Sequence, residues 1–138
     1  MTDPALFAKK LARIETCVSE LRNLATPERL SVDIREQRFV EHTLEIAIQA
    51  ALDVAAHIVS DERLGEPRAN RELFDLLERH GWIAAPLASS LRSMVGVRNV
   101  LVHGYNEVDL AIVRDVLTHH LVDLELFVET VRRRAAIG

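Results

Sequence analysis

Four polar side chains that could do chemistry lie within eight residues of an otherwise apolar stretch, Met94 to Tyr105. They are Arg98, Asn99, His103 and Tyr105. Polar groups embedded in apolar sequence either find partners or have a function. The planar, permanently charged guanidinium of an arginine suits a phosphate, and a histidine can take up or release a proton near neutral pH. The pattern predicts chemistry at a phosphate, with Arg98 and His103 as the catalytic residues and Asn99 beside them.

The spacing of this pair constrains the backbone. Arg98 and His103 are five residues apart, so a continuous helix would separate their directions by about 140°. For both to face one site, the helix must end or loosen near His103. Gly104 is the natural terminator, because glycine accepts the left-handed backbone that closes a helix. We therefore expect His103 at the carboxyl end of a helix.

Each of these residues also has an ordinary structural interpretation. Arg98 could bridge to a carboxylate, since structural ion pairs outnumber catalytic arginines. His103 could be a satisfied, partly buried histidine. Asn99 could hydrogen-bond locally, and Tyr105 could be an anchoring aromatic.

No second set of residues predicts a metal or cofactor site. The single cysteine, Cys17, excludes an internal disulfide, and neither a CxxC pair nor a Cys/His metal spacing occurs. No pair of histidines four residues apart has an acid arranged as in a zinc site. We interpret the other histidines as solvated or structural: His42, His57, His80, His119 and His120.

The charge limits how a nucleic acid could bind. The formal net charge is -4, whereas a protein that held nucleic acid by charge alone should be basic. An RNA ligand would need a local patch or contact with one exposed phosphate. Arg132 to Arg134 are interpreted as a cluster at a helix end, where cations are favourable, although they could touch RNA.

The surrounding sequence predicts an all-helical, up-and-down bundle of about five helices. Glycine (5) and proline (4) are sparse, and hydrophobic residues make up 49% of the chain. Apolar stripes and capping signals place the helices at about 4–25, 27 or 31 to 60, 71–80, 86–101 and 109–134.

The second predicted helix is apolar on most sides, which predicts a central position. A narrow polar ridge runs along it at four-residue steps, and it could be a solvated or an interface stripe. Its residues are Glu41, Glu45, Gln49, Asp53 and His57. Because these interrupt the run Leu44 to Val59, we expect no membrane span there. The lone cysteine and the acidic start, without a signal-peptide core, predict a cytoplasmic protein.

The segment resembles the signature of HEPN domains, an arginine and a histidine separated by four to six residues. The longer form Arg-Asn-x-Leu-Val-His-x-Tyr, from Arg98 to Tyr105, is similar to the HepT branch of that family (DUF86). The likeness extends to the Gly-x-Pro-x-x-x-Arg-Glu loop, from Gly65 to Glu72, and to Val108–Leu110. It covers most of the chain, so we expect residues 1–138 to form one HEPN domain.

The resemblance implies a metal-independent RNA endonuclease that acts as the toxin of a type VII HepT/MntA toxin–antitoxin system, without a cofactor. The partner would be an MntA-type minimal nucleotidyltransferase that transfers AMP to Tyr105. Bulk and negative charge added there would keep an RNA phosphate away from Arg98 and His103. The substrate would be mRNA or tRNA.

The chemistry of RNA cleavage predicts that the chain acts as a homodimer. RNA carries its own nucleophile, the 2′-hydroxyl, so one group must accept that proton and another must protonate the leaving 5′-oxygen. Each chain offers one His103. Two copies related by a two-fold axis would supply both groups in a shared cleft. The alternative is a non-catalytic HEPN dimer that binds a nucleotidyltransferase.

Overall fold

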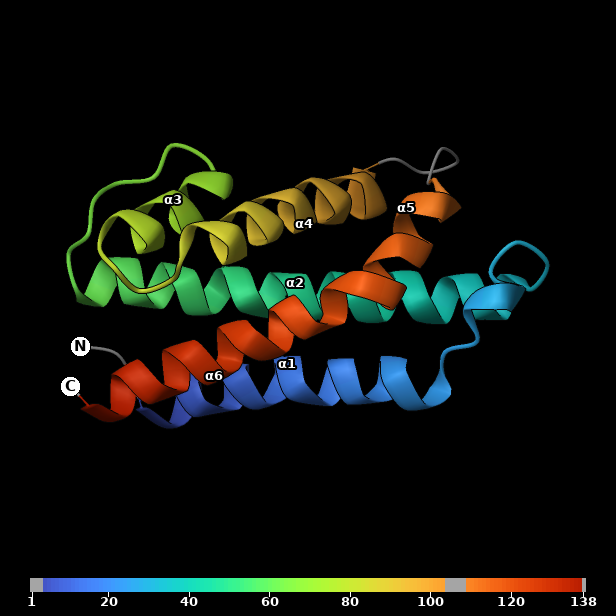
Figure 1. Cartoon of the computed structure of the whole chain (residues 1–138), viewed down its shortest axis with the longest axis horizontal. Coiled ribbons are helices and arrows are strands. Elements are labelled where there is room, and N and C mark those ends of the chain that lie inside the picture. Colours follow the sequence, from blue (N-terminus) through green and yellow to red (C-terminus); the bar gives the residue numbers. More distant parts are fainter. Residues whose placement is uncertain (1–3, 104–108, 138) are drawn as a thin grey trace.

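The structure, a computed structural model, describes residues 4–103 and 109–137, with the side chains of 136 and 137 left out. The described residues form helices and connecting turns without a strand, which confirms the all-helical bundle (Figure 1). The helices are α1 (Pro4–Leu24), α2 (Ile34–Asp61), α3 (Arg71–Arg79), α4 (Ala85–His103), α5 (Leu110–Asp115) and α6 (Leu121–Ile137).

Helices α1 and α2 form an antiparallel pair, which is joined by a short turn. The apolar stripe of α1 packs as predicted, with Leu11, Ile14, Val18 and Leu21 buried. The start of α2 differs from the expectation. Pro27 begins only a 3-10 turn, and α2 starts after Asp33, whose side chain accepts a hydrogen bond from the Arg35 amide at 2.9 Å. A carboxylate at the N-cap position satisfies a free amide of the first turn.

Helix α2 is the core helix. It packs against α1, α3 and α4, and its apolar side chains are buried by them. The polar interruptions of Leu44–Val59 led us to expect no membrane span, but by length and composition alone the whole helix passes such a test. Its 28 residues are long and apolar enough to cross a membrane, but 61% of its most apolar stretch is buried inside the bundle. Burial of this kind is what a central helix of a bundle requires.

Helices α3 and α4 form a hairpin along one side of α2 (Figure 1). Helix α3 ends as predicted, because Gly81 adopts a positive φ of 78°. The side chain of Asn70, at the N-cap position of α3, makes no capping hydrogen bond, and the Glu72 carboxylate accepts a hydrogen bond from the Arg68 amide at 2.7 Å. Helix α4 runs two residues further than predicted and ends at His103.

The last helix differs from the single regular helix that we predicted. Asp109 caps α5, as expected, by accepting from the Ala111 amide at 2.9 Å. A π-helical turn at Val116–His120 then separates α5 from α6. The His120 ring lies between Asp115, at 3.2 Å, and Asp123, at 2.9 Å. A π turn adds one residue to a helical turn and is not visible in an apolar stripe.

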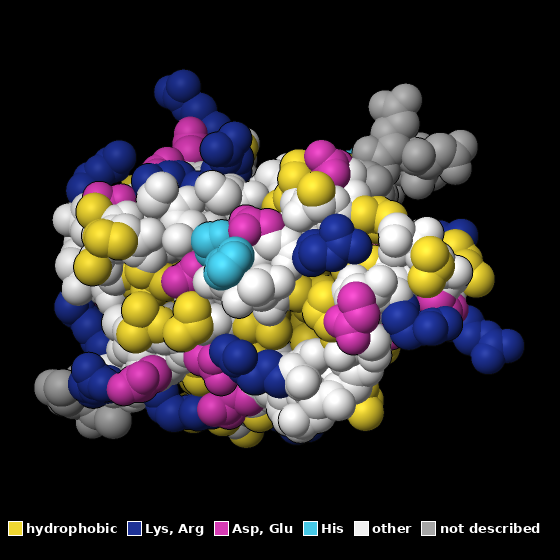
Figure 2. Space-filling model, turned by 45° about the vertical axis from the view of Figure 1, so that its right-hand side comes forward, with side chains coloured by type: hydrophobic (Ala, Val, Ile, Leu, Met, Phe, Trp, Pro, Cys, Tyr) yellow, Lys and Arg dark blue, Asp and Glu magenta, His cyan; other side chains and the backbone are white. Residues whose placement is uncertain are grey.

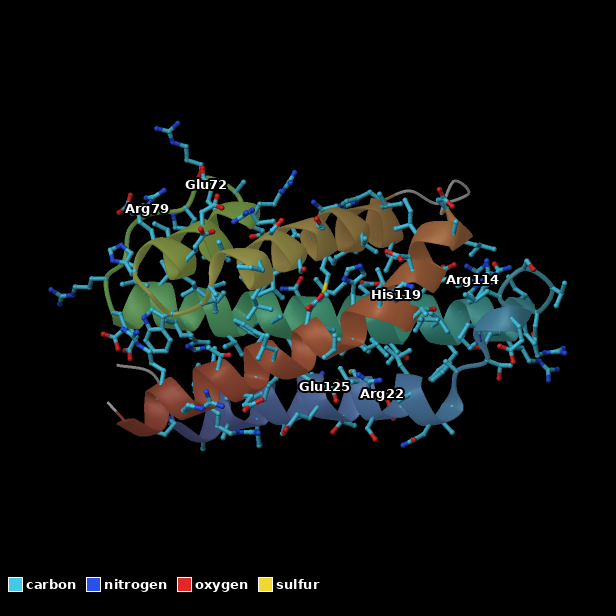
Figure 3. All side chains as sticks on the ribbon, in the orientation of Figure 1. Arg22, Glu72, Arg79, Arg114, His119 and Glu125 are labelled. Atoms are coloured by element: carbon cyan, nitrogen blue, oxygen red, sulfur yellow. The ribbon has the colours of Figure 1, made fainter. Side chains whose placement is uncertain are left out.

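Ion pairs join α6 to the rest of the bundle and account for the arginine cluster at its end. Arg132 forms two hydrogen bonds of 2.9 Å with Glu15 of α1. Arg134 lies over the Trp82 ring at 4.6 Å and donates to the Gly81 carbonyl at 2.9 Å. Arg133 pairs with Glu129 on its own helix. The seam between α6 and α1 also contains the pair of Arg22 and Glu125, which point toward one another in Figure 3.

Candidate active site at the end of α4

Arg98 continues the buried face of α4 toward the carboxyl end of that helix. Leu91, Met94 and Val95 lie on this face and are buried against the core. Arg98 follows Met94 by four residues and Val95 by three, so it leaves the helix on the same side. The last turns of α4 lie at the edge of the core, and there the face carries a half-buried guanidinium.

The Arg98 side chain enters a cleft of about 290 Å³ between α1, α2 and α4. Three of the five ridge residues of α2, namely Glu45, Gln49 and Asp53, line this cleft. Asp53 pairs with Lys10 of α1 at 3.0 Å and accepts from Gln49 at 2.9 Å. The ridge is therefore half-buried, and its middle faces the cleft rather than open solvent. The remaining lining residues are Lys10, Arg13, Ile46 and Ala50.

One donor of Arg98 is left without a partner among the described residues. Its Nη1 donates to Asn99 Oδ1 at 3.2 Å. Its Nε is buried and has no hydrogen-bond acceptor in the described part of the chain. A buried donor without an acceptor is costly, and native structures contain few of them. Arg98 therefore keeps a donor that the described residues do not satisfy, and a change of its side-chain rotamer would be needed to bring this Nε to a phosphate oxygen.

His103 is the last residue of α4 and is exposed. Helix α4 is regular up to His103, and the predicted closure at Gly104 lies outside the described residues. Arg98 and His103 therefore leave α4 in directions about 140° apart. Within residues 4–103 and 109–137, no hydrogen bond joins the two side chains. A single chain does not bring them together in the described region, and Gly104 and Tyr105 lie outside it.

The remaining histidines lie apart from this site. His42, His80 and His119 are exposed and His57 is half-buried, while His120 is held by the two aspartates described above. The described residues contain no cluster of three or more His, Cys, Asp or Glu side chains placed to hold a metal ion.

The face of the molecule drawn in Figure 2 carries side chains of both charges. Figure 2 shows one face on which lysine and arginine lie among aspartate and glutamate, without a broad area of one sign. This agrees with the formal net charge of -4. A phosphate would therefore meet local cations rather than a large basic field.

Sequence reasoning did not find the cations of α1 that line the cleft. Lys10 and Arg13 are distant from the motif in the sequence, and their positions in α1 resemble those of any exposed lysine or arginine. Their proximity to Arg98 results from the packing of α1 and α4 against the same helix. Only a partial signal for this cleft was present in the sequence: the four-residue spacing of Asp53 and the other ridge residues predicted a polar line along α2.

Comparison with known proteins adds a family likeness. The profile described as "Ribonuclease HepT-like" matches residues 14–131, which include both Arg98 and His103. A protein of Shewanella oneidensis named mRNA nuclease HepT is 34% identical over 128 residues, which are 92% of this chain and 96% of that protein.

Two further proteins extend this likeness. A tRNA nuclease HepT of Aphanizomenon flos-aquae is 29% identical over 78% of this chain and 74% of its own length. Among solved structures, the tri-AMPylated HEPN toxin of Shewanella oneidensis in complex with MNT antitoxin superposes with a TM-score of 0.87. It is 34% identical, and the match covers 96% of this chain and 99% of that one.

Proposed function

This chain belongs to the HepT-like ribonuclease family, and on that premise we propose that it is an RNA endonuclease, the toxin of a toxin–antitoxin pair. The observation that carries the proposal is the Arg98 guanidinium, which is half-buried and has one donor without an acceptor among the described residues. It lies on the helix whose last described residue is the exposed His103. The related mRNA and tRNA nucleases support RNA as the substrate.

The proposed reaction uses the RNA's own 2′-hydroxyl. An imidazole of His103 accepts the proton of this hydroxyl, and the oxygen attacks the neighbouring phosphorus. The bond from phosphorus to the 5′-oxygen breaks, and a second imidazole protonates that oxygen. Arg98 binds the phosphate and stabilises the charge that develops on it. Asn99 accepts a hydrogen bond from Arg98 and so holds the guanidinium in place. The products are a 2′,3′-cyclic phosphate and a 5′-hydroxyl.

The two imidazoles come from two copies of the chain. Each chain has one His103, and it is exposed at the end of α4. Arg98 and His103 also diverge in direction, so a composite site across a two-fold axis would let one RNA phosphate contact both kinds of group. We therefore propose a homodimer whose two motifs line one shared cleft. No metal ion is required for the nucleophile, because the RNA supplies it.

An antitoxin of the MntA type, a minimal nucleotidyltransferase, is the proposed partner. The related toxin of Shewanella oneidensis occurs AMPylated and in complex with MNT antitoxin. We propose Tyr105 as the acceptor of AMP in this chain, where the added phosphate would repel the phosphate of an RNA. Intact-mass measurement after incubation with the antitoxin and ATP tests this: a gain of AMP that persists in Tyr105→Phe would remove Tyr105 from the account.

We further propose that residues 1–138 act as one domain in the cytoplasm, where mRNA and tRNA occur. The central experiment is RNA cleavage by purified protein and by the variants Arg98→Ala and His103→Ala. Removing a general acid or base lowers a rate by about 10²- to 10⁴-fold. Arg13→Ala, which changes another cation at the cleft, is the control for a general loss of positive charge. Wild-type cleavage by both motif variants, with circular dichroism unchanged, would refute the proposal.

A further inference from the structure

A second hollow lies on the other side of α4 from the Arg98 cleft, and no residue of the proposed reaction has been assigned to it. This α4–α5 groove has a volume of about 470 Å³. Its walls are largely aliphatic and come from both helices, and the exposed side chains Val100 and Ile112 lie at its rim. The aliphatic lining residues are Val97, Val100, Leu101, Ile112 and Val113.

The face of α4 that lines the groove continues toward His103. Arg92, Gly96 and Val100 follow at four-residue steps and His103 comes three residues later, so all four lie on one stripe of the helix. With a rise of about 1.5 Å per residue, His103 stands about 4.5 Å beyond Val100 and about 10.5 Å beyond Gly96. The stripe of α4 that forms the groove floor therefore continues to His103, which lies beyond the residues that line the groove.

Gly96 leaves the helix backbone uncovered in this floor. A Cβ atom placed at Gly96 would meet nothing within 4 Å. The fold therefore does not require glycine there for close packing, and no positive φ occurs at this position. Glycine inside a helix is less stable than alanine, and its usual use at such a site is to let a ligand approach the backbone closely.

The charges around the groove leave one cation available. Arg92 is held by Asp75 at 2.9 Å and Glu78 at 3.1 Å. Asp109 is occupied as the cap of α5. Arg71, at the start of α3, lines the groove and has no hydrogen bond or ion pair with another described residue.

We propose that the α4–α5 groove binds the base of a nucleotide that flanks the cleaved bond of single-stranded RNA, and that Arg71 contacts a phosphate further along. The inference rests on the proposed ribonuclease function. Unstacked bases are accessible only in single strands and loops, and the groove offers aliphatic side chains against which the flat face of a base can be removed from water. Because aliphatic walls make no hydrogen bonds that distinguish one base from another, we expect a single-stranded substrate in which the flanking position accepts any base.

Gly96→Leu tests the inference, because a Cβ at this position meets nothing within 4 Å and the rest of the side chain would occupy groove space. Ser89→Leu is the matched control: it lies on the same stripe of α4 and is exposed, but outside the groove. With a short single-stranded RNA, we expect Gly96→Leu to raise KM about tenfold, with kcat changed much less, and Ser89→Leu to behave as wild type. Arg71→Ala should weaken binding and reduce its dependence on salt.

A second arm measures binding without cleavage. The RNA carries a 2′-deoxy nucleotide at the cleaved position and, in one version, no base at the flanking position. Removing that base should weaken binding to wild type and to Ser89→Leu about tenfold, and to Gly96→Leu hardly at all. Equal base dependence in all three proteins would overturn the groove proposal.

The two arms also separate this inference from the function on which it rests. Base-dependent binding by a protein that cuts no RNA would leave the groove assignment intact and refute the ribonuclease. Unchanged RNA binding and cleavage by Gly96→Leu, with loss of the antitoxin complex, would assign the groove to the antitoxin and overturn our proposal.

Discussion

Replacing Arg98 with methionine should stabilise the folded chain while it abolishes RNA cleavage. Methionine keeps the length of the aliphatic stem but removes the guanidinium. Among the described residues, that group has one hydrogen bond, 3.2 Å long, to an exposed Asn99 side chain, and one buried donor without an acceptor. An unsatisfied buried donor costs about 1–3 kcal/mol, and an ordinary hydrogen bond contributes about 0.5–1.5 kcal/mol. The expected net gain is about 1 kcal/mol.

Arg92→Met is the matched control on the same helix. Arg92 donates to two carboxylates, Asp75 and Glu78, and all three side chains are partly exposed. Its removal should cost about 1 kcal/mol after allowance for solvent. The two substitutions are chemically identical and should have opposite effects on stability, because only one of the arginines has its donors satisfied.

Urea unfolding followed by far-ultraviolet circular dichroism measures both variants. A gain of about 1 kcal/mol corresponds to a rise in Tm of about 4 °C for a domain of this size. The protein concentration must be the same in all samples, because dimerisation also stabilises the folded state. Loss of stability in Arg98→Met equal to that in Arg92→Met would refute the reasoning, and would mean that the Arg98 donors are satisfied in solution.

Three further predictions concern the bundle. Phe127→Ala should cost about 3–5 kcal/mol in urea unfolding, because the Phe127 ring is fully buried edge-on against Phe74 at 5.9 Å; a cost below 1 kcal/mol would contradict this packing. Burial raises the pKa of the Cys17 thiol, and Glu20 adds to this effect, so thiol reagents should label the protein only when it unfolds. Rapid labelling of the native protein would contradict this prediction. A hydrogen bond from Arg132 lowers the pKa of Glu15, so their pair should stabilise the fold above pH 4.5 and lose this effect as the pH falls through the lowered pKa. The difference in free energy of unfolding between wild type and Glu15→Gln should therefore shrink in acid, and a difference that grows in acid would contradict the prediction.

The sequence was sufficient to predict the fold because its signals are local and repeated. The stripes of α1 and α2, the glycine after α3 and the cap at Asp109 each place an element without tertiary information. Two predictions were wrong for local reasons: the start of α2 and the continuity of the last helix. Both Pro27 and Asp33 are signals for a helix start, and α2 begins after Asp33. The π turn before α6 changes the helical repeat while it keeps apolar residues facing the core.

The candidate site was predictable only in part. The pattern of Arg98, Asn99 and His103 is visible in the sequence, as is the end of α4 at the histidine. The depth of the Arg98 cleft and the contribution of Lys10 depend on how α1 and α4 pack against α2, which no local pattern encodes. The side-chain hydrogen bond from Arg98 to Asn99 also shows that consecutive residues on a helix can interact when one of them has a long side chain.

The most direct test of the account is a heterodimer in which one subunit is wild type and the other carries His103→Ala. The shared cleft needs two imidazoles for one bond cleavage, one as base and one as acid. In single-turnover RNA cleavage, the purified heterodimer should therefore lose about 10²-fold or more of the wild-type rate. A rate half that of the wild-type homodimer would mean that each subunit cleaves with its own histidine, and it would contradict the composite site.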